Sequence, residues 1–521
     1  RGTESFILQA SDLSVSGNVE QTNGTLDAGN SVIKVAGNWT RTGGVFVPSA
    51  STVTFNGISN TAVGSTSQPS QEYTFNRLTI AKAENITLTA HNNIRVNADF
   101  DIASGTLSLG TKTVSRTAPG GNFTMGSGSV LLLEGSNFPI NFSNVTLNTT
   151  SHVKYEGTTV QAVAAVTYGH LTLDNGVAVE KTLQAGTRVN GDLTITDDAT
   201  LNGAGKTLTI SGNFIKASTG VFNAGATYAE GTLVLAAATP AAQKQLNGAF
   251  TVHNMLLEAG ANYIIPSNDL LIKGNFTNQG TIDGTTRRVT FESDFLNSET
   301  GVLKSSGVAA FSGTRLQTIQ LRAPIQGSVP HPLNPAITIP PAVEFNGNVA
   351  PVLNSTAAPS FGKVTINNQD PAGIRTSVGW TVNLDFNVSA GATFDGGAYT
   401  HNFLTAILNS GTIMSSGTIN FTPSGLAGLS AYPIKFGTTP ASFQSTGTLY
   451  IGSSQLVALS GVVPSQLNNL TIDNKHALGV TTQGLSAELP LYGTTWTING
   501  NLSILSGAKF NAGAGTTYII G

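Results

Sequence analysis

The sequence contains no cysteine, and only 10% of its 521 residues are charged. The first absence excludes disulfides, zinc–thiolate sites and thiol nucleophiles. The charged fraction is less than half of the roughly 25% that is typical of soluble domains. Lysine and arginine number 25 against 28 aspartate and glutamate residues, and the densest basic group is the pair Arg287–Arg288. Nucleic-acid binding needs a basic stripe, so this class of function is set aside.

Long apolar runs and helical patterns are also missing. No apolar stretch approaches the 18 residues of a membrane span, and the best helical segment, PAAQKQL at 240–246, is too short to count. Hydrophobic residues still make up 40% of the chain, which is too apolar for a disordered linker. A chain with so few charges must present threonine, serine and asparagine to water. That surface is typical of β-rich extracellular proteins.

A short element recurs along the chain: two apolar residues around a polar one, then Gly-Asn or Gly-Asp and an apolar residue. Its copies are VSGNV at 15–19, VAGNWT at 35–40, GGNFT at 120–124, VNGDLTI at 189–195, ISGNFI at 210–215, IKGNFT at 272–277 and INGNLSI at 498–504. Gly17 and Gly37 lie 20 residues apart, and Gly191 and Gly212 lie 21 apart. A step of this length is one coil of a parallel β-helix.

A second element marks a longer period, in which a strand such as VTFNG at 53–57 is followed by one such as LTIAKAEN at 78–85. These pairs divide a single continuous solenoid, 1–521, into approximate modules. The modules are 1–52, 53–152, 153–232, 233–342, 343–448 and 449–521.

The alternation of apolar residues with threonine in these triplets is the period-2 pattern of a strand with one buried face. We therefore predict a right-handed parallel β-helix with coils of about 20 residues and loop insertions, forming one rod without a hinge. The expected core residues are Val53, Phe55, Leu78, Ile80, Leu171, Leu173, Leu208, Ile210, Leu470 and Ile472. Tandem β-sandwich domains are the alternative, because 80–110 residues is also a sandwich length.

Insertions are expected between the two strands of each module, at 58–74, 158–169, 236–252, 348–363 and 452–468. A sixth insertion, 323–342, is rich in proline and so cannot join a central ladder. Insertions at one point of a repeat lie on one side of a solenoid, which is often the binding side. The predicted binding residues are Pro324, Pro330, His331, Pro332 and Pro335.

Parallel β-helices also include polysaccharide lyases and glycosidases, whose sites need carboxylates on adjacent coils. The densest acidic group is Asp174, Asp192, Asp197 and Asp198. Each lies in a turn sequence, where aspartate bonds the backbone, and Asp385 and Asp395 are interpreted in the same way. The seven histidines are dispersed, without metal-ligand spacing, and no calcium-binding GGxGxD series occurs. We therefore expect no enzymatic activity, no cofactor and no metal.

Strings such as GNWTRTGGVFVPSASTVTFNG followed by FNRLTI resemble the repeats of large surface proteins of Bacteroidota exported by the type IX secretion system. The resemblance implies a long extracellular protein at the cell surface that adheres to glycans or proteins of other cells. We also expect self-association into an oligomer or filament, because so few charges oppose it. The chain starts at Arg1 and stops inside a repeat at Gly521, so we expect it to be part of a longer protein, with any sorting domain beyond Gly521. A carbohydrate-active β-helix enzyme is the alternative function.

Overall fold

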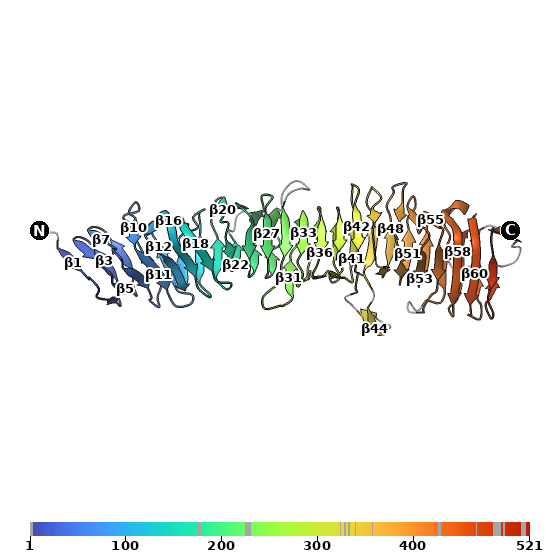
Figure 1. The fold of residues 1–521 in the computed structure, drawn as a ribbon, viewed down its shortest axis with the longest axis horizontal. Helices are drawn as coiled ribbons and strands as arrows, with labels where there is room; N and C mark the ends of the chain where they lie inside the picture. Colours follow the sequence, from blue (N-terminus) through green and yellow to red (C-terminus); the bar gives the residue numbers. More distant parts are fainter. Residues whose placement is uncertain are drawn as a thin grey trace. The chain divides into compact units, whose positions relative to one another are not determined.

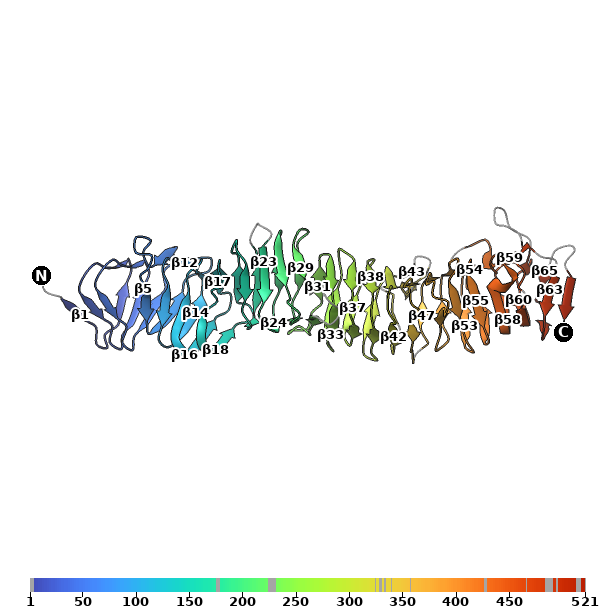
Figure 2. The same ribbon diagram turned by 90° about the horizontal axis from the view of Figure 1, so that it is seen from above.

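The computed structural model describes residues 4–174, 179–223, 231–323, 325–327, 330–331, 334–338, 340–356, 358–425, 429–464, 466–482, 491–492, 495–511 and 517–520. These residues form two compact units. Unit 1 is residues 1–234, 238–240 and 244–248, and unit 2 is residues 235–237, 241–243 and 249–521. Each unit is a stack of short parallel strands, with coils of roughly 21 residues (Figures 1 and 2).

The strands of unit 1 stack in register along the sides of its coils. One side has β1 (Ser5–Ile7), β4 (Thr25–Asp27) and β7 (Val45–Val47). A second has β2 (Leu13–Val15), β5 (Val32–Val35), β8 (Thr52–Phe55), β11 (Arg77–Ala81), β14 (Phe100–Ser104), β16 (Val114–Met125) and β18 (Ile140–Leu147), with β10 (Tyr73–Phe75) and β13 (Ile94–Val96). The third has β3 (Val19–Gln21), β6 (Trp39–Arg41), β9 (Thr61–Val63), β12 (Thr87–Ala90), β15 (Thr106–Ser108), β17 (Val130–Leu133), β19 (His152–Tyr155), β22 (His170–Leu173), β25 (Leu193–Ile195), β28 (Phe214–Lys216) and β31 (Lys244–Asn247). Later coils add β20 (Gln161–Val163), β23 (Val179–Leu183), β26 (Ala199–Asn202) and β29 (Val221–Asn223), and β21 (Thr167–Tyr168), β24 (Thr187–Val189), β27 (Thr207–Ile210) and β30 (Thr232–Leu235).

Unit 2 is built in the same way. Its longest ladder has β32 (Phe250–Val252), β35 (Leu270–Ile272), β38 (Arg288–Phe291), β41 (Val308–Phe311), β45 (Ala342–Phe345), β48 (Val364–Ile366), β51 (Asp385–Val388), β54 (Ala406–Asn409), β57 (Tyr432–Lys435), β59 (Val457–Val462), β61 (Val480–Thr481) and β65 (Phe510–Asn511), with β62 (Leu491–Tyr492) on β59. Two shorter ladders have β33 (Asn254–Leu257), β36 (Phe276–Asn278), β39 (Phe295–Asn297), β42 (Thr318–Leu321) and β46 (Val352–Leu353), and β34 (Asn262–Ile264), β37 (Thr281–Asp283) and β40 (Val302–Lys304). The last sheet has β47 (Ser360–Phe361), β49 (Ile374–Arg375), β50 (Thr381–Val382), β52 (Thr393–Asp395), β53 (Thr400–Phe403), β55 (Thr412–Ser415), β56 (Thr418–Phe421), β58 (Phe443–Ser453), β60 (Gln466–Asn474), β63 (Thr495–Ile498), β64 (Leu502–Ile504) and β66 (Thr517–Ile520).

The period-2 triplets form the core as the sequence predicts. All ten predicted core residues are at most 2% exposed. The threonines between the paired residues are half-buried, except Thr172, which is buried. In unit 1, Val53 lies in register with Leu78, and Leu78 with Phe100 on the next coil. Each buried side chain of this size stabilises the fold by about 1.5–3 kcal/mol. The pairing strands are parallel and one coil apart, so the β-solenoid prediction is confirmed and the tandem-sandwich alternative is wrong.

The recurrent Gly-Asn pair forms a corner that bonds to the next coil. The Asn38 amide donates to Asn18 Oδ1 at 2.9 Å, and Ala62 N donates in turn to Asn38 Oδ1 at 2.8 Å. A Cβ atom at Gly37 would lie 2.4 Å from the Gly17 carbonyl oxygen, so only glycine fits there. The same bond recurs from Asn213 to Asp192, Gln245 to Asn213, Asn275 to Asn254, Thr318 to Asp294 and Asn501 to Asn469.

Most of the predicted insertions are regular parts of a coil, and that prediction is wrong. Segment 58–74 contains β9, which pairs with β6 and β12, and segment 158–169 contains β20 and β21. Segment 236–252 likewise contains β31 and β32, and segment 348–363 contains β46 and β47. Segment 452–468 contains β59 and the start of β60. Some of these strands carry a polar residue at an inward position, as in TAV at 61–63 and QAV at 161–163, so they lack the apolar alternation that marks the other strands.

Candidate functional site

The middle of the proline-rich segment 323–342 leaves the parallel ladder, as the sequence predicts, whereas Gln326 forms a parallel bridge with Lys304 and Ala342 begins β45. Pro330 and His331 form β43 (Pro330–His331), which pairs antiparallel with β44 (Asn334–Thr338), where Pro335 lies. In Figure 1 β44 projects from the body of unit 2. Pro324 and Pro332 lie outside the described residues. The segment therefore has a hairpin geometry that differs from the coils around it, and its role in binding stays a prediction.

The acidic residues named from the sequence mostly serve turns. Asp192 Oδ1 accepts the Asn213 amide at 2.7 Å, and Asp197 Oδ1 accepts the Thr219 hydroxyl at 3.0 Å. Asp198 has a positive φ of 62°, as an aspartate in a tight turn can. Asp395 Oδ1 accepts the Gly397 amide at 3.0 Å, whereas Asp385 begins strand β51 and is not a turn residue. Most of these carboxylates therefore stabilise turns or the contact with the next coil, and these contacts do not bring them into one cluster.

Three carboxylates do stack on successive coils, at Glu134, Glu156 and Asp174. They directly follow β17, β19 and β22, whose last residues Leu133, Tyr155 and Leu173 are in register. Burial raises the pKa of the Glu156 carboxyl. The positive charge of Lys154 lowers this pKa, and the negative charges of Glu134 and Asp174 raise it further. A carboxyl with a raised pKa beside two other carboxylates is an arrangement that acid–base catalysis can use.

Asp174 of this row is among the acidic residues predicted from the sequence, whereas Glu134 and Glu156 are not. The available signal was the repeated position after an apolar triplet, in LLLEG, VKYEG and LTLDN. Asp174 Oδ1 accepts the Thr196 hydroxyl at 2.7 Å, which ties the row to the following coil.

A pair of histidines lies on the same strands. His152 Nε2 is 2.7 Å from Thr172 Oγ1, and His170 Nδ1 accepts the Asp192 amide at 2.9 Å. Burial, together with Lys154 and His170, lowers the pKa of His152 to about 4, so its ring is neutral at neutral pH. His152 begins β19 and Glu156 follows it, so about 13 Å of strand separates the histidines from the carboxylate row. The two groups therefore cannot act on the same bond.

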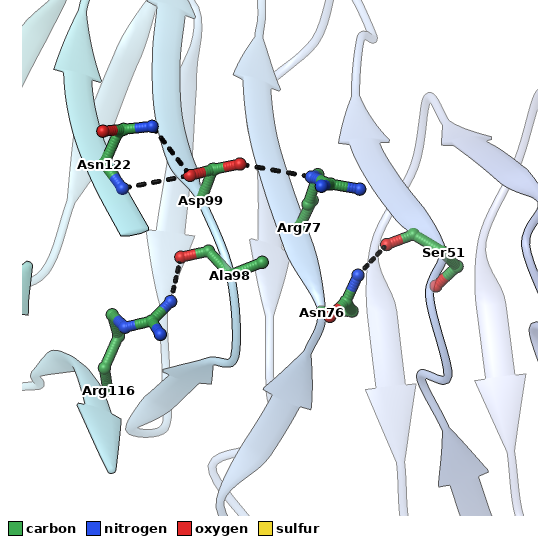
Figure 3. Close-up of polar contacts among 7 residues, drawn as sticks. All are labelled: Ser51, Asn76, Arg77, Ala98, Asp99, Arg116 and Asn122. Atoms are coloured by element: carbon green, nitrogen blue, oxygen red, sulfur yellow. Dashed lines mark hydrogen bonds and ion pairs between the residues drawn. The ribbon is translucent and has the colours of Figure 1, made fainter. Parts of the chain in front are cut away.

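The outer face of unit 1 carries a polar network that runs from coil to coil (Figure 3). Arg77 Nε lies 3.2 Å from Asp99 Oδ2, and Asp99 Oδ1 accepts both the backbone and side-chain amides of Asn122 at 3.0 Å. Asn144 Nδ2 continues the network to Asn122 Oδ1 at 3.0 Å. Beside it, Arg116 donates to the Ala98 carbonyl and Asn76 to the Ser51 carbonyl. The polar side chains of this face therefore bond to one another or to backbone carbonyls of neighbouring coils.

Comparisons of the chain with protein-family models, with curated proteins and with solved structures find no match. Within the described ranges, no histidines, aspartates and glutamates gather in threes in a way that could hold a metal ion. No helix in the same part of the chain has the length and apolar character needed to cross a membrane.

Proposed function

We propose that the protein is an extracellular structural and adhesive protein of the cell surface, which attaches to glycans or proteins of other cells. The observation that carries the proposal is the contrast between the two faces of the coils. The inner face is filled with large apolar side chains, and the outer face carries like polar residues in register on successive coils, such as Thr54 with Thr79 and Asn402 with Asn420. Repetition of a weakly charged polar surface suits contact with an extended ligand at many points.

The repeat strings support export to the surface of a member of the Bacteroidota by the type IX system, as the sequence resemblance implies. Surface display agrees with a chain without cysteine that gains its stability from stacked coils. Assembly of identical chains side by side is part of the same proposal, because the low charge leaves little repulsion between copies.

Adhesion is tested with the purified chain attached to latex beads. Coated beads should bind to bacterial or host cells above the level of beads coated with albumin, and soluble chain should compete. Binding at the albumin level to every surface offered would contradict the proposal. Small-angle scattering on the same sample tests the predicted single rod, for which about 21 coils at 4.8 Å give a length of about 100 Å.

The carboxylate row Glu134–Glu156–Asp174 favours a second candidate function, a carbohydrate-active enzyme. The test is incubation of the chain with neutral and acidic polysaccharides, followed by assays for new reducing ends and for unsaturated sugars. Turnover that is lost in Glu156→Gln but kept in the turn variant Asp197→Asn would establish the enzyme. Absence of turnover would leave the structural function.

A further inference from the structure

One outward-facing aromatic side chain in unit 2 lies flat along its strand. Tyr450 is on β58, between the buried residues Leu449 and Ile451, and its ring points out of the coil. A Cβ atom built at Gly452 would lie 2.4 Å from Tyr450 Cε1 and 2.7 Å from its hydroxyl oxygen. The ring therefore extends over Gly452, in space that any other residue would fill, and it stays partly exposed.

Polar groups border this ring on the following coil, along β60 and just after it. The Tyr450 hydroxyl donates to Asp473 Oδ2 on β60 at 2.8 Å, and Lys475 forms an ion pair with the other oxygen of the same carboxylate. Thr471 lies in register with Tyr450 on β60, and the next coil places Leu505, which is 43% exposed, beside Asp473. An apolar surface is thus bordered by a carboxylate, an ammonium group and a hydroxyl.

A ladder of amides approaches the ring from the preceding coils. Asn420 Nδ2 donates to Asn402 Oδ1 at 2.8 Å, and Asn402 Nδ2 reaches Thr381 Oγ1 at 3.4 Å. Asn420 is in register with Tyr450, and its Oδ1 is buried without a hydrogen-bond partner. The hydrogen-bonded column therefore ends at Asn420, and at Tyr450 on the next coil the outer surface changes from amide to aromatic.

We propose that Tyr450, with Asp473, Lys475 and Thr471, binds a neutral pyranose unit of a glycan. One face of a pyranose is lined with C–H groups and fits an aromatic ring, and its hydroxyls fit the carboxylate, ammonium and hydroxyl groups around that ring. The charges of Asp473 and Lys475 neutralise each other in their ion pair, which favours an uncharged sugar over an acidic one. The inference rests on the adhesive function proposed above and gives it one site and one ligand class.

The experiment is affinity electrophoresis of the full chain in native gels that contain dextran, mannan, xylan or β-1,3-glucan, with alginate as the acidic polysaccharide. The variants are Tyr450→Ala, Tyr450→Phe and Gly452→Ala, and the matched control is Tyr399→Ala, which removes another tyrosine of unit 2 that is 40% exposed. Circular dichroism of every variant checks that the fold is kept.

At least one neutral polysaccharide should retard the wild-type chain, and alginate should not. Tyr450→Ala should weaken that binding about tenfold or more, whereas Tyr450→Phe keeps the ring and should stay within about threefold. Gly452→Ala should also weaken binding, because the new Cβ displaces the ring, and Tyr399→Ala should bind like the wild type.

Three results overturn the site: no retardation of the wild type by any neutral polysaccharide, unchanged binding in Tyr450→Ala, or equal losses in the alanine and phenylalanine variants. The bead assay separates these results from failure of the adhesive function. If Tyr450→Ala binds glycan like the wild type and coated beads still attach to cells, the site is wrong and adhesion stands. If wild-type beads attach to nothing, the adhesive function itself fails.

Discussion

The most informative perturbation is replacement of a lysine that lies inside the solenoid. Lys181 on β23 is completely buried, and its Nζ donates to the Gly157 carbonyl at 2.5 Å. It lies in register with Gln161, whose Nε2 bonds the carbonyls of Leu133 at 3.1 Å and Gly135 at 2.7 Å. Both side chains therefore hold the carbonyl groups of one corner.

Burial, partly offset by Asp174, lowers the pKa of the Lys181 ammonium to about 8. The unfolded chain has a lysine pKa of about 10.4, so between these values it holds more protons than the folded protein. The free energy of unfolding therefore rises with pH across this interval, and this gain is absent below about pH 8. From pH 7 to pH 9.5 the rise amounts to about 2 kcal/mol.

The assay is urea unfolding of the wild type and Lys181→Met at pH 7 and pH 9.5, followed by far-UV circular dichroism. The wild type should gain about 2 kcal/mol more than the variant over this range. Measurements stop at pH 9.5 because burial raises the pKa of Tyr155 to about 12, and a tyrosine shifted in this direction lowers stability above pH 10. Equal pH dependence in the two proteins would refute the burial of Lys181. Asp174→Asn is the control for the direction of the pKa shift. Loss of this carboxylate should lower the Lys181 pKa further and so increase the rise of the free energy of unfolding with pH.

Three further predictions concern the coils and their assembly. Ile210→Asp should destabilise unit 1 by about 3 kcal/mol or more, because it buries an unpaired charge, and an unchanged thermal midpoint would show that Ile210 faces outward. Gly212→Ala should lower the free energy of unfolding by about 1–3 kcal/mol, because its Cβ would lie 2.2 Å from the Gly191 carbonyl oxygen. The control Gly17→Ala, at the same motif position, should have little effect, because no atom lies within 4 Å of its Cβ. Equal effects of the two substitutions would contradict the close approach at Gly212. The mass of the chain measured by sedimentation should increase with concentration into the micromolar range, whereas a strict monomer, unaffected by deletion of 323–342, would leave a solitary chain.

The fold could be predicted from the sequence because two local signals agree. The triplets around Val53, Leu171 and Leu470 fix which face is buried, and the Gly-Asn pairs fix where each coil turns. The predicted insertions failed because strands such as β9 and β20 carry a polar residue, Thr61 or Gln161, at an inward position where other strands carry a bulky apolar one. Those strands are held by the coils above and below them, and a single segment of sequence does not reveal such support.

Sites are harder to predict than coils for a related reason. Glu134, Glu156 and Asp174 are 22 and 18 residues apart, so their alignment depends on coils of unequal length. Lys181 occupies an inward position of VEKTL, where the period-2 pattern predicts an apolar residue. The buried ammonium group is accommodated there by its hydrogen bond to the Gly157 carbonyl, which the sequence does not reveal. In the sequence, Tyr450 is one of three consecutive apolar residues, LYI. The register shows that Leu449 and Ile451 face inward and that Tyr450 faces outward.

The stacking that creates the fold also determines how such a surface can bind. In the described ladders, outward positions on paired strands lie in register one coil apart, about 4.8 Å along the stack, as Asn402, Asn420 and Tyr450 show. A change of one residue therefore alters one step of a column and leaves the coil intact, provided that the inward neighbours are kept. Tyr450 is such a step, since its register partners are asparagine and threonine. Weak contacts at several steps add up for a ligand that is itself repetitive, because each bound unit raises the effective concentration of the next. An adhesive solenoid can in this way gain affinity from its number of coils, without the enclosed pocket on which an enzyme depends.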